Sequence, residues 1–251
     1  MKVSIITVTY NSASYIADCI KSVNDQSYHN IEHIIIDGAS SDNTLVIVNT
    51  LLSRISKVVS EPDNGIYDAI NKGIKLASGK IIGVLNSDDF YHRNDLISQI
   101  VETFTDKSIQ SVFGDVRFVN PKNLNKTVRY YSSKRFSPHL FQFGIMPAHT
   151  TFFTYKKYFT EFGYYKTDYE IAGDFELLIR FMHVNKLAYK YLPIDMLKMR
   201  TGGKSTKSIN STLTINKEVI RACKENGIKT NFFLVSLKYF FKVFELFFVK
   251  N

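Results

Sequence analysis

The chain has few of the residues that hold small secreted or metal-stapled domains together. Only two of its 251 residues are cysteines, Cys19 and Cys223, and their spacing is unlike that of metal ligands. The sequence therefore argues against a disulfide framework or a zinc site, and it predicts reduced thiols, as in the cytoplasm.

Long uncharged runs and a signal peptide are also missing. No stretch of 18 residues is free of charge, and the nearest approach, residues 232–249, contains Lys238, Lys242 and Glu245. A membrane-spanning helix is therefore not expected. The first residues run directly into a strand-like pattern, so no signal peptide is expected either.

The chain does have enough apolar material for a packed core. Hydrophobic residues make up 45% of it, which excludes disorder over most of its length. The length suits one large α/β domain, or one domain with a small annex. There are 32 Lys and Arg against 23 Asp and Glu, a net charge of +9. Such a charge predicts an anionic partner: a nucleotide, diphosphate, phospholipid or nucleic acid.

Short apolar runs, separated by helical patterns, occupy residues 1–90. The runs are rich in Ile and Val and cover residues 3–9, 33–36, 58–59 and 81–85. Strands that alternate with helices predict a mostly parallel sheet with right-handed crossovers, whose ligands bind beyond the carboxyl ends of the strands. Polar residues follow every run: Asn11, Asp37, Asp63, and Asn86 to Asp89.

The pattern changes after residue 105. Short strands are predicted at residues 112–113, 127–131 and 150–154. A helix is predicted to begin at Gly173, and another strand is expected at residues 189–200, followed by a Gly-Gly loop and closing helices. We therefore expect one α/β domain over residues 1–205 and a helical extension over residues 206–251.

Several segments, in order, resemble the motifs of family-2 glycosyltransferases, which have the GT-A fold. They are residues 4–11 (SIITVTYN), 35–44 (IIDGASSDNT), 61–73 (EPDNGIYDAINKG), 85–89 (LNSDD) and 172–177 (AGDFEL). The resemblance covers residues 3–205. Within the family, the sequence most resembles bacterial transferases that build surface polysaccharide on a lipid carrier. It implies an α/β fold with a mostly parallel sheet flanked by helices, and a helical C-terminal extension.

Two positions depart from the commonest family pattern. Asn86 stands where the first Asp of the Asp-x-Asp metal motif is usual, and Gly173 stands where a Glu often precedes the catalytic base. The first change makes metal binding depend on Asp88 and on phosphate oxygens. The second removes one contact to the acceptor.

The resemblance implies that the strand ends bind a nucleotide diphosphate. The residues that match its nucleotide site are Thr9, Asn11, Asp37, Asp63, Asn86 and Ser87. Two of them have an ordinary alternative explanation, because Asp37 precedes a glycine and Asp63 begins an Asp-Asn-Gly turn. In such turns the side chain bonds its own backbone.

Residues 86–89 place two carboxylates and one amide at a strand exit. Asp88 is the candidate ligand for Mn²⁺ or Mg²⁺, which prefer hard oxygen donors, and the diphosphate would complete the site. Asp89 is a second candidate, either as a ligand or as a contact that orients the donor sugar. The alternative is a helix N-cap or a solvated acidic turn.

Asp174 matches the family's catalytic base, which removes the proton of the acceptor hydroxyl during inverting transfer. The alternative is an N-cap, because Asp is favoured at the start of a helix. His149 lies either near the donor or acceptor pocket or in ordinary packing. Arg200 and Lys204 flank two glycines in a loop that either folds over the diphosphate or is simply solvated.

Bulky apolar residues near the C-terminus share one face of a predicted helix. They are Phe233, Leu237, Phe240, Phe241, Phe244, Phe247 and Phe248, with Lys238, Lys242 and Glu245 beside and opposite them. A membrane surface, a second subunit in a homodimer, or the protein's own core would each cover this face. The nearby lysines favour peripheral attachment to the cytoplasmic face of the inner membrane.

These patterns and the resemblance together predict a metal-dependent inverting glycosyltransferase that uses a UDP-hexose or UDP-N-acetylhexosamine donor. The resemblance implies an acceptor saccharide linked to a lipid diphosphate, as in O-antigen or capsule synthesis. A sugar-nucleotide nucleotidyltransferase is the nearest alternative, but residues 10–14 lack its Gly-rich basic loop. A nucleic-acid-binding module is the other. The basic residues are scattered and form no readout motif, so no nucleic-acid partner is expected.

Overall fold

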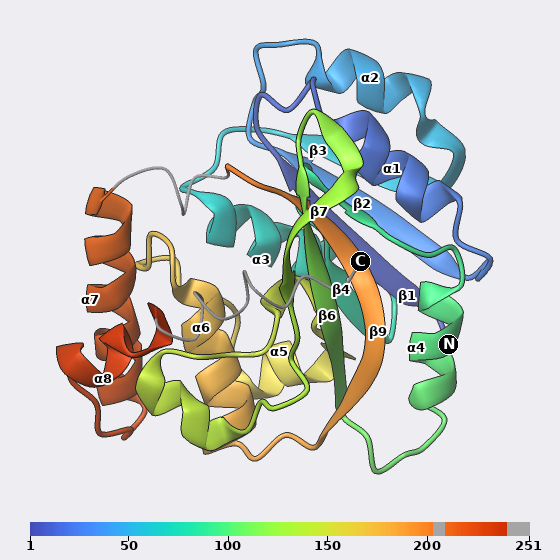
Figure 1. Ribbon diagram of the computed structural model, residues 1–251. Coiled ribbons are helices and arrows are strands. Elements are labelled where there is room, and N and C mark those ends of the chain that lie inside the picture. The colour runs from blue at the N-terminus through green and yellow to red at the C-terminus, as the bar shows by residue number, and fades with distance from the viewer. Residues whose placement is uncertain (203–208, 240–251) are drawn as a thin grey trace.

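The computed structural model describes residues 1–202 and 209–239, and Figure 1 shows helices arranged around a curled sheet. The strands are β1 (Val3–Thr9), β2 (Ile31–Asp37), β3 (Ile55–Ser60), β4 (Ile81–Val84), β5 (Asp89–Tyr91), β6 (Ser111–Asn120), β7 (Asn123–Tyr131), β8 (Phe153–Tyr155) and β9 (Tyr189–Arg200). The longer helical segments are α1 (Ile16–Asn24), α2 (Thr44–Thr50), α3 (Ile66–Leu76), α4 (Leu96–Thr103), α5 (Lys157–Phe162), α6 (Gly173–Leu178), α7 (Ile209–Glu225) and α8 (Phe232–Ser236). Shorter ones are η1 (Leu52–Arg54), η2 (Pro138–Phe143), η3 (His149–Thr151) and the π-helix η4 (Ile179–Val184).

The described strands form a single sheet in the order β3-β2-β1-β4-β8-β6-β9-β5, with β7 paired to β6. β1 lies between β2 and β4 and runs parallel to both. All seven residues of β1 are buried. This agrees with its continuous run of small and β-branched residues, because a parallel strand that is covered on both faces needs no polar alternation.

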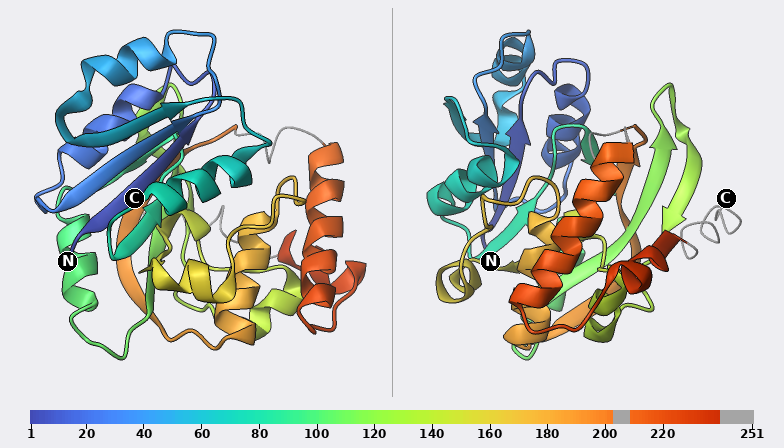
Figure 2. Two further views of the ribbon diagram at one scale, coloured as in Figure 1. Left: turned by 180° about the vertical axis from the view of Figure 1, so that it is seen from behind. Right: turned by 90° about the vertical axis from the view of Figure 1, so that its left-hand side faces the viewer.

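Helices cover both faces of the parallel part of the sheet. Residues of α3, α5, α6 and α7 share one apolar core with Ile6 and Val8 of β1, whereas residues of α1 and α4 share another with Val3 and Ile5. Figure 2 shows α3 and α5 in front of the strands when the molecule is seen from behind. One strand supplies both cores because successive side chains point to opposite faces.

The second half of the sheet mixes strand directions. β4 and β8 are antiparallel, β6 runs parallel to β9, and β9 is antiparallel to β5. The two halves approach closely at Gly83 of β4, where an added Cβ would lie 2.2 Å from the ring of Phe153. A glycine is therefore required where β4 packs against β8.

Two predicted strands differ from those observed. The strand expected at residues 112–113 extends over the whole of β6, and the strand expected at residues 150–154 begins only at Phe153. Residues before it form η3, because the Thr151 hydroxyl donates to the Ala148 carbonyl at 2.6 Å and accepts from the Gly114 N–H at 3.0 Å. A threonine hydroxyl that bonds backbone groups competes with strand pairing.

The C-terminal helix was predicted incorrectly at Lys238. This side chain was expected beside the apolar face, yet Lys238 is only 6% exposed, because its stem and Val235 pack against Gly144. Phe233 is 72% exposed. The rest of the predicted face lies outside the described residues: Phe240, Phe241, Phe244, Phe247 and Phe248, with Lys242 and Glu245. Among the helices that the structure describes, none is long and apolar enough to cross a membrane.

Arg180 fastens α6 to the segment after α5. Its guanidinium pairs with the fully buried Glu176 at 2.9 Å and donates to the carbonyls of Gly163 and Tyr164 at 2.6 and 2.8 Å. In an Arg180→Met variant, Glu176 keeps only the ion pair with Lys166. The free energy of unfolding in urea should fall by about 3–5 kcal/mol, the usual cost of breaking a buried pair.

Arg93→Met is the matched control. Arg93 forms its ion pair with Asp95 at the surface, where both side chains are 40% exposed. Exposed pairs contribute little to stability, so this variant should unfold close to the wild type. Equal losses in the two variants would show that the Arg180 cluster does not anchor α6.

Candidate active site

Loops at the carboxyl ends of β1, β2 and β4 are joined by short hydrogen bonds. Asn11, which has a positive φ of 48°, accepts from the Ser41 N–H through its side chain at 2.9 Å. Its own N–H donates to the Ser40 hydroxyl at 2.8 Å. The hydroxyls of Ser12 and Ser87 lie 2.9 Å apart and connect the first loop to the one after β4. The polar strand ends therefore meet, as the parallel sheet predicted.

Asp37 is completely buried at the end of β2. One carboxylate oxygen accepts from the Ser40 hydroxyl at 2.5 Å, and the other accepts from the Ser40 N–H at 2.9 Å and the Ser60 hydroxyl at 2.7 Å. These contacts match the turn alternative and extend it to β3. Asp37 thus shapes the loop that holds Asn11, and its contact with a nucleotide stays a prediction.

Thr9 and Asp63 present unused polar atoms at the same edge. Thr9 is 5% exposed, and its hydroxyl has no hydrogen-bond partner among the described residues. Asp63 accepts from the Gly65 N–H at 2.9 Å through one oxygen, while its other oxygen lies against Gly38, where a Cβ would be 2.6 Å away. A buried hydroxyl without a partner is rare in folded proteins, so Thr9 suits a ligand contact.

The loop after β4 separates its two carboxylates. Asp88 is half-buried, and its carboxylate has no hydrogen bond or ion pair with the described residues. Asp89 is 1% exposed, and burial, followed by the charge of Asp88, raises its pKa well above the usual value. The Asn86 amide is 3.5 Å from it. The contact between Asp89 and a metal or the donor sugar stays a prediction.

Arg200 ends the strand that was expected at residues 189–200, and it is not part of an open loop after that strand. It is the last residue of β9 and is 9% exposed. Its guanidinium donates to the Asp88 carbonyl at 2.5 Å, pairs with Asp18, and packs over the rings of Tyr15 and Phe90. The guanidinium of Arg200 is therefore held against the turn that carries Asp88. Lys204 lies outside the described residues.

Asp174 lies in the first turn of α6 and faces His149 of η3. The Asp174 carboxylate and the His149 Nδ1 are 2.9 Å apart, and the side chains are 14% and 37% exposed. The N-cap of α6 is Ala172, so the capping alternative for Asp174 does not hold. A second oxygen accepts from the Phe175 N–H at 2.8 Å. The Asp174 carboxylate still has lone pairs for a partner besides His149 and the Phe175 N–H.

Tyr67 of α3 was not singled out from the sequence, although it lies inside the segment 61–73. Its hydroxyl donates to the Ile171 carbonyl at 2.5 Å and accepts from the Gly173 N–H at 2.9 Å. An added Cβ at Gly173 would lie 2.7 Å from the Tyr67 ring, which explains the glycine before Asp174. The signal in the sequence was a phenol within an apolar helical stripe.

Asp88 is the residue here that fits a divalent cation. The described residues contain no group of three or more His, Cys, Asp or Glu side chains that could hold a metal. One unpaired carboxylate at a strand end is enough for Mg²⁺ or Mn²⁺ only where phosphate oxygens and water complete the coordination. The donor set therefore fits a cation that arrives with a diphosphate.

The His149–Asp174 pair predicts a defined titration. Burial lowers the pKa of His149, but the charge of Asp174 and their hydrogen bond outweigh it, and the pKa lies above 6.5. The ion pair with protonated His149 contributes fully to stability below the ordinary pKa of histidine. This contribution is lost as the pH rises through the raised pKa of His149. NMR titration of Asp174→Asn should show the His149 pKa falling, with the exposed His29 ring as control. An unchanged His149 pKa would contradict the pairing.

Comparison with known proteins places the chain in a family. A family model described as glycosyl transferase family 2 matches residues 4–163. An uncharacterised glycosyltransferase of Mycobacterium tuberculosis is 33% identical over 182 residues, which cover 71% of this chain and 68% of that protein. The chondroitin synthase of Pasteurella multocida is 30% identical over 195 residues, which cover 74% of this chain but only 20% of the synthase.

Solved structures have the same fold. TarS 1-349 of S. aureus in complex with UDP-GlcNAc aligns with a TM-score of 0.68 at 16% identity, over 88% of this chain and 66% of that one. The mannosyltransferase PcManGT from Pyrobaculum calidifontis, in complex with GDP-Man and Mn²⁺, aligns with a TM-score of 0.62 at 18% identity, over 89% and 63%. The chain thus spans just under two thirds of these structures. It belongs to glycosyl transferase family 2 and has the GT-A fold of that family.

Proposed function

We propose that this glycosyltransferase transfers one sugar from a nucleotide diphosphate donor to a saccharide hydroxyl, with inversion at the anomeric carbon. The observation that carries the proposal is the Asp174 carboxylate, which contacts His149 of η3 and keeps lone pairs for an acceptor. η3 packs against β4, the strand that is followed by the turn with the unpaired Asp88. The donor class is UDP-hexose or UDP-N-acetylhexosamine. A solved relative in complex with UDP-GlcNAc supports this choice.

The nucleoside occupies the joined strand ends in this proposal. Its contacts come from Thr9, Asn11, Asp37, Asp63, Asn86 and Ser87, and the partnerless hydroxyl of Thr9 is the strongest support. The diphosphate lies next to Asp88, which would hold Mn²⁺ or Mg²⁺. When bound, such a cation neutralises the charge that grows on the departing diphosphate.

Asp174 is the base in the transfer step. The acceptor oxygen attacks the anomeric carbon while the bond from that carbon to the diphosphate oxygen breaks, and the hydroxyl proton moves to the Asp174 carboxylate. His149 donates to the same carboxylate and fixes its direction. Two other carboxylates close to Asp174 in the sequence fit the role of base less well. Glu176 is fully buried in ion pairs, and Asp168 pairs with Arg221 at the surface.

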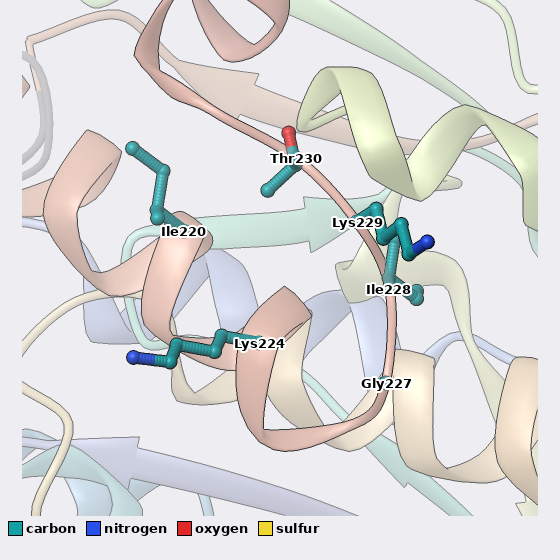
Figure 3. A pocket seen from close by; sticks show the side chains of 6 residues that line it. All are labelled: Ile220, Lys224, Gly227, Ile228, Lys229 and Thr230. Atoms are coloured by element: carbon teal, nitrogen blue, oxygen red, sulfur yellow. The ribbon is translucent and has the colours of Figure 1, made fainter.

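The acceptor is proposed to be a saccharide on a lipid diphosphate at the cytoplasmic face of the inner membrane, as in O-antigen or capsule synthesis. Relatives named chondroitin synthase and hyaluronan synthase support a polysaccharide product. Phe232 and Phe233 expose apolar surface on α8. Just before α8 in the chain is a hollow of about 340 Å³. Figure 3 shows the side chains that line it: Ile220, Lys224, Gly227, Ile228, Lys229 and Thr230.

Lys224 and Lys229 line this hollow, whereas Lys238 is buried. Cations beside exposed apolar side chains favour an anionic lipid surface. A second subunit is the alternative occupant of the aromatic face. Family membership leaves the nucleotidyltransferase and the nucleic-acid-binding module without a supporting observation.

Asp174→Asn should reduce turnover by about 10²–10⁴-fold, the usual contribution of a general base. UDP affinity should stay the same, because Asp174 contacts the acceptor rather than the nucleotide. UDP release and calorimetric UDP binding measure the two quantities. Asp168→Asn, which removes an exposed carboxylate of the same type, should keep both. Near-normal turnover in Asp174→Asn would place the base elsewhere.

Asp88→Ala should remove the Mn²⁺ dependence of UDP binding, because no other unpaired carboxylate at this turn can hold the cation. Calorimetry with UDP, run with Mn²⁺ and then with a chelator, separates the two contributions. Asp106→Ala, at an exposed turn distant in sequence, is the control. If Asp88→Ala binds UDP with the wild-type response to Mn²⁺, the metal assignment fails.

A further inference from the structure

The backbone that enters α6 is held by one side chain of α7. N–H groups at and before the start of a helix have no acceptor within it. The Glu218 carboxylate accepts from all three N–H groups of residues 170–172. One oxygen accepts from Glu170 at 2.6 Å, and the other accepts from Ile171 and Ala172 at 2.9 and 2.8 Å. Hydrogen bonds to a charged acceptor are roughly twice as strong as neutral ones, so this contact fixes three consecutive amides.

Tyr67 of α3 binds the next amide on the same stretch. Its hydroxyl accepts from the Gly173 N–H at 2.9 Å and donates to the Ile171 carbonyl at 2.5 Å. The N–H groups of residues 170–173 are therefore all bonded to side chains of α3 and α7. Asp174 follows directly, in the first turn of α6. The direction in which its carboxylate points thus depends on this stretch of backbone.

One side of α7 is built into the apolar core, which fixes the helix that carries Glu218. Val219, Ala222 and Cys223 are almost completely buried. They share a core with Phe175 of α6, and α7 packs against α6 (Figure 1). Glu218 is half-buried beside Val219 in the sequence, so its hydrogen bonds are partly shielded from water. Such shielding strengthens them.

Two other side chains of α7 contact the same region, but at the surface. Arg221 pairs with Asp168, and the two side chains are 40% and 60% exposed. Glu225 accepts from the Lys166 ammonium and from the Tyr169 hydroxyl, each at 2.9 Å. Exposed ion pairs contribute little to stability. The bonds of both side chains to this segment also end at residue 169, before the amides that Glu218 holds.

We propose that Glu218 is a positioning residue for the proposed catalytic base: it fixes the backbone before α6 and thereby holds the Asp174 carboxylate in its direction. The proposal rests on the proposed glycosyl transfer, in which Asp174 takes the acceptor proton. Glu218 acts through residues 170–172 rather than on the substrate. The helical extension thus contributes to the transfer step, in addition to the membrane attachment proposed above.

Glu218→Gln keeps the shape of the side chain but replaces one accepting oxygen by a donating NH₂ group. At least one N–H of residues 170–172 then loses its acceptor, and Asp174 shifts relative to His149. The His149 pKa, followed by NMR, should fall in the same direction as in Asp174→Asn. Turnover, measured as UDP release from UDP-glucose and UDP-GlcNAc, should fall about 10–100-fold, because a misplacement of about 1 Å has that scale of effect. The calorimetric Kd for UDP should not change.

Two further variants separate position from charge and from general packing. Glu218→Asp keeps the charge but is one methylene shorter, so a smaller fall in the His149 pKa is expected. A fall in this variant comes from displacement, since no charge is lost, and it also serves if Glu218→Gln does not fold. Glu225→Gln is the matched control, because it makes the same change on the same helix, at contacts that end at residue 169. It should leave the His149 pKa and turnover unchanged.

An unchanged His149 pKa in both Glu218 variants, or an equal fall in Glu225→Gln, would overturn the proposal. Its failure can be told from failure of the transferase proposal. A wild type that releases no UDP contradicts glycosyl transfer, while a fall of the His149 pKa in Glu218→Gln still shows that Glu218 positions Asp174. Normal turnover in Glu218→Gln, with Asp174→Asn inactive, defeats the positioning role alone.

Discussion

The hydrogen bond from Arg200 to the backbone carbonyl of Asp88 joins the two halves of the sheet at the candidate active site. Arg200 ends β9 in the mixed half, and Asp88 follows β4 in the parallel half. The guanidinium is also paired with Asp18 and packed on Tyr15 and Phe90, so its position is fixed from several sides. Because the guanidinium bonds the backbone carbonyl of Asp88, the Asp88 carboxylate stays available for other partners.

The carboxylates of the candidate site differ in burial and in how many of their oxygens the protein already uses. Asp37 and Asp89 are almost fully buried. Both oxygens of Asp37 accept hydrogen bonds from serine residues, whereas burial raises the pKa of Asp89. Asp88 and Asp174 keep lone pairs that the protein does not use. A buried carboxylate with every oxygen bonded shapes a loop, whereas one with free oxygens can accept a cation or a proton. The proposed chemistry depends on that division.

Much of the parallel half could be predicted from the sequence, because its strands are short apolar runs with polar ends. The meeting of Asn11 with the loop after β2 follows from that pattern alone. Contacts that depend on distant pairing could not be predicted. The strand that ends at Arg200 was expected, but nothing local reveals that Arg200 pairs with Asp18, and His149 could not be matched to Asp174. Lys238 was placed on a polar side by helical spacing, but packing against Gly144 buries it.

The most direct test of the donor site measures the Tm of the wild-type chain with UDP, GDP, CDP and dTDP, each with and without Mn²⁺. A ligand that binds only the folded state raises the Tm, and the rise grows with the logarithm of the ligand concentration relative to its Kd. The proposed site predicts a large rise for UDP only when Mn²⁺ is present, with smaller effects of UDP or Mn²⁺ alone. No rise with any nucleotide, or the same rise with and without Mn²⁺, would contradict it.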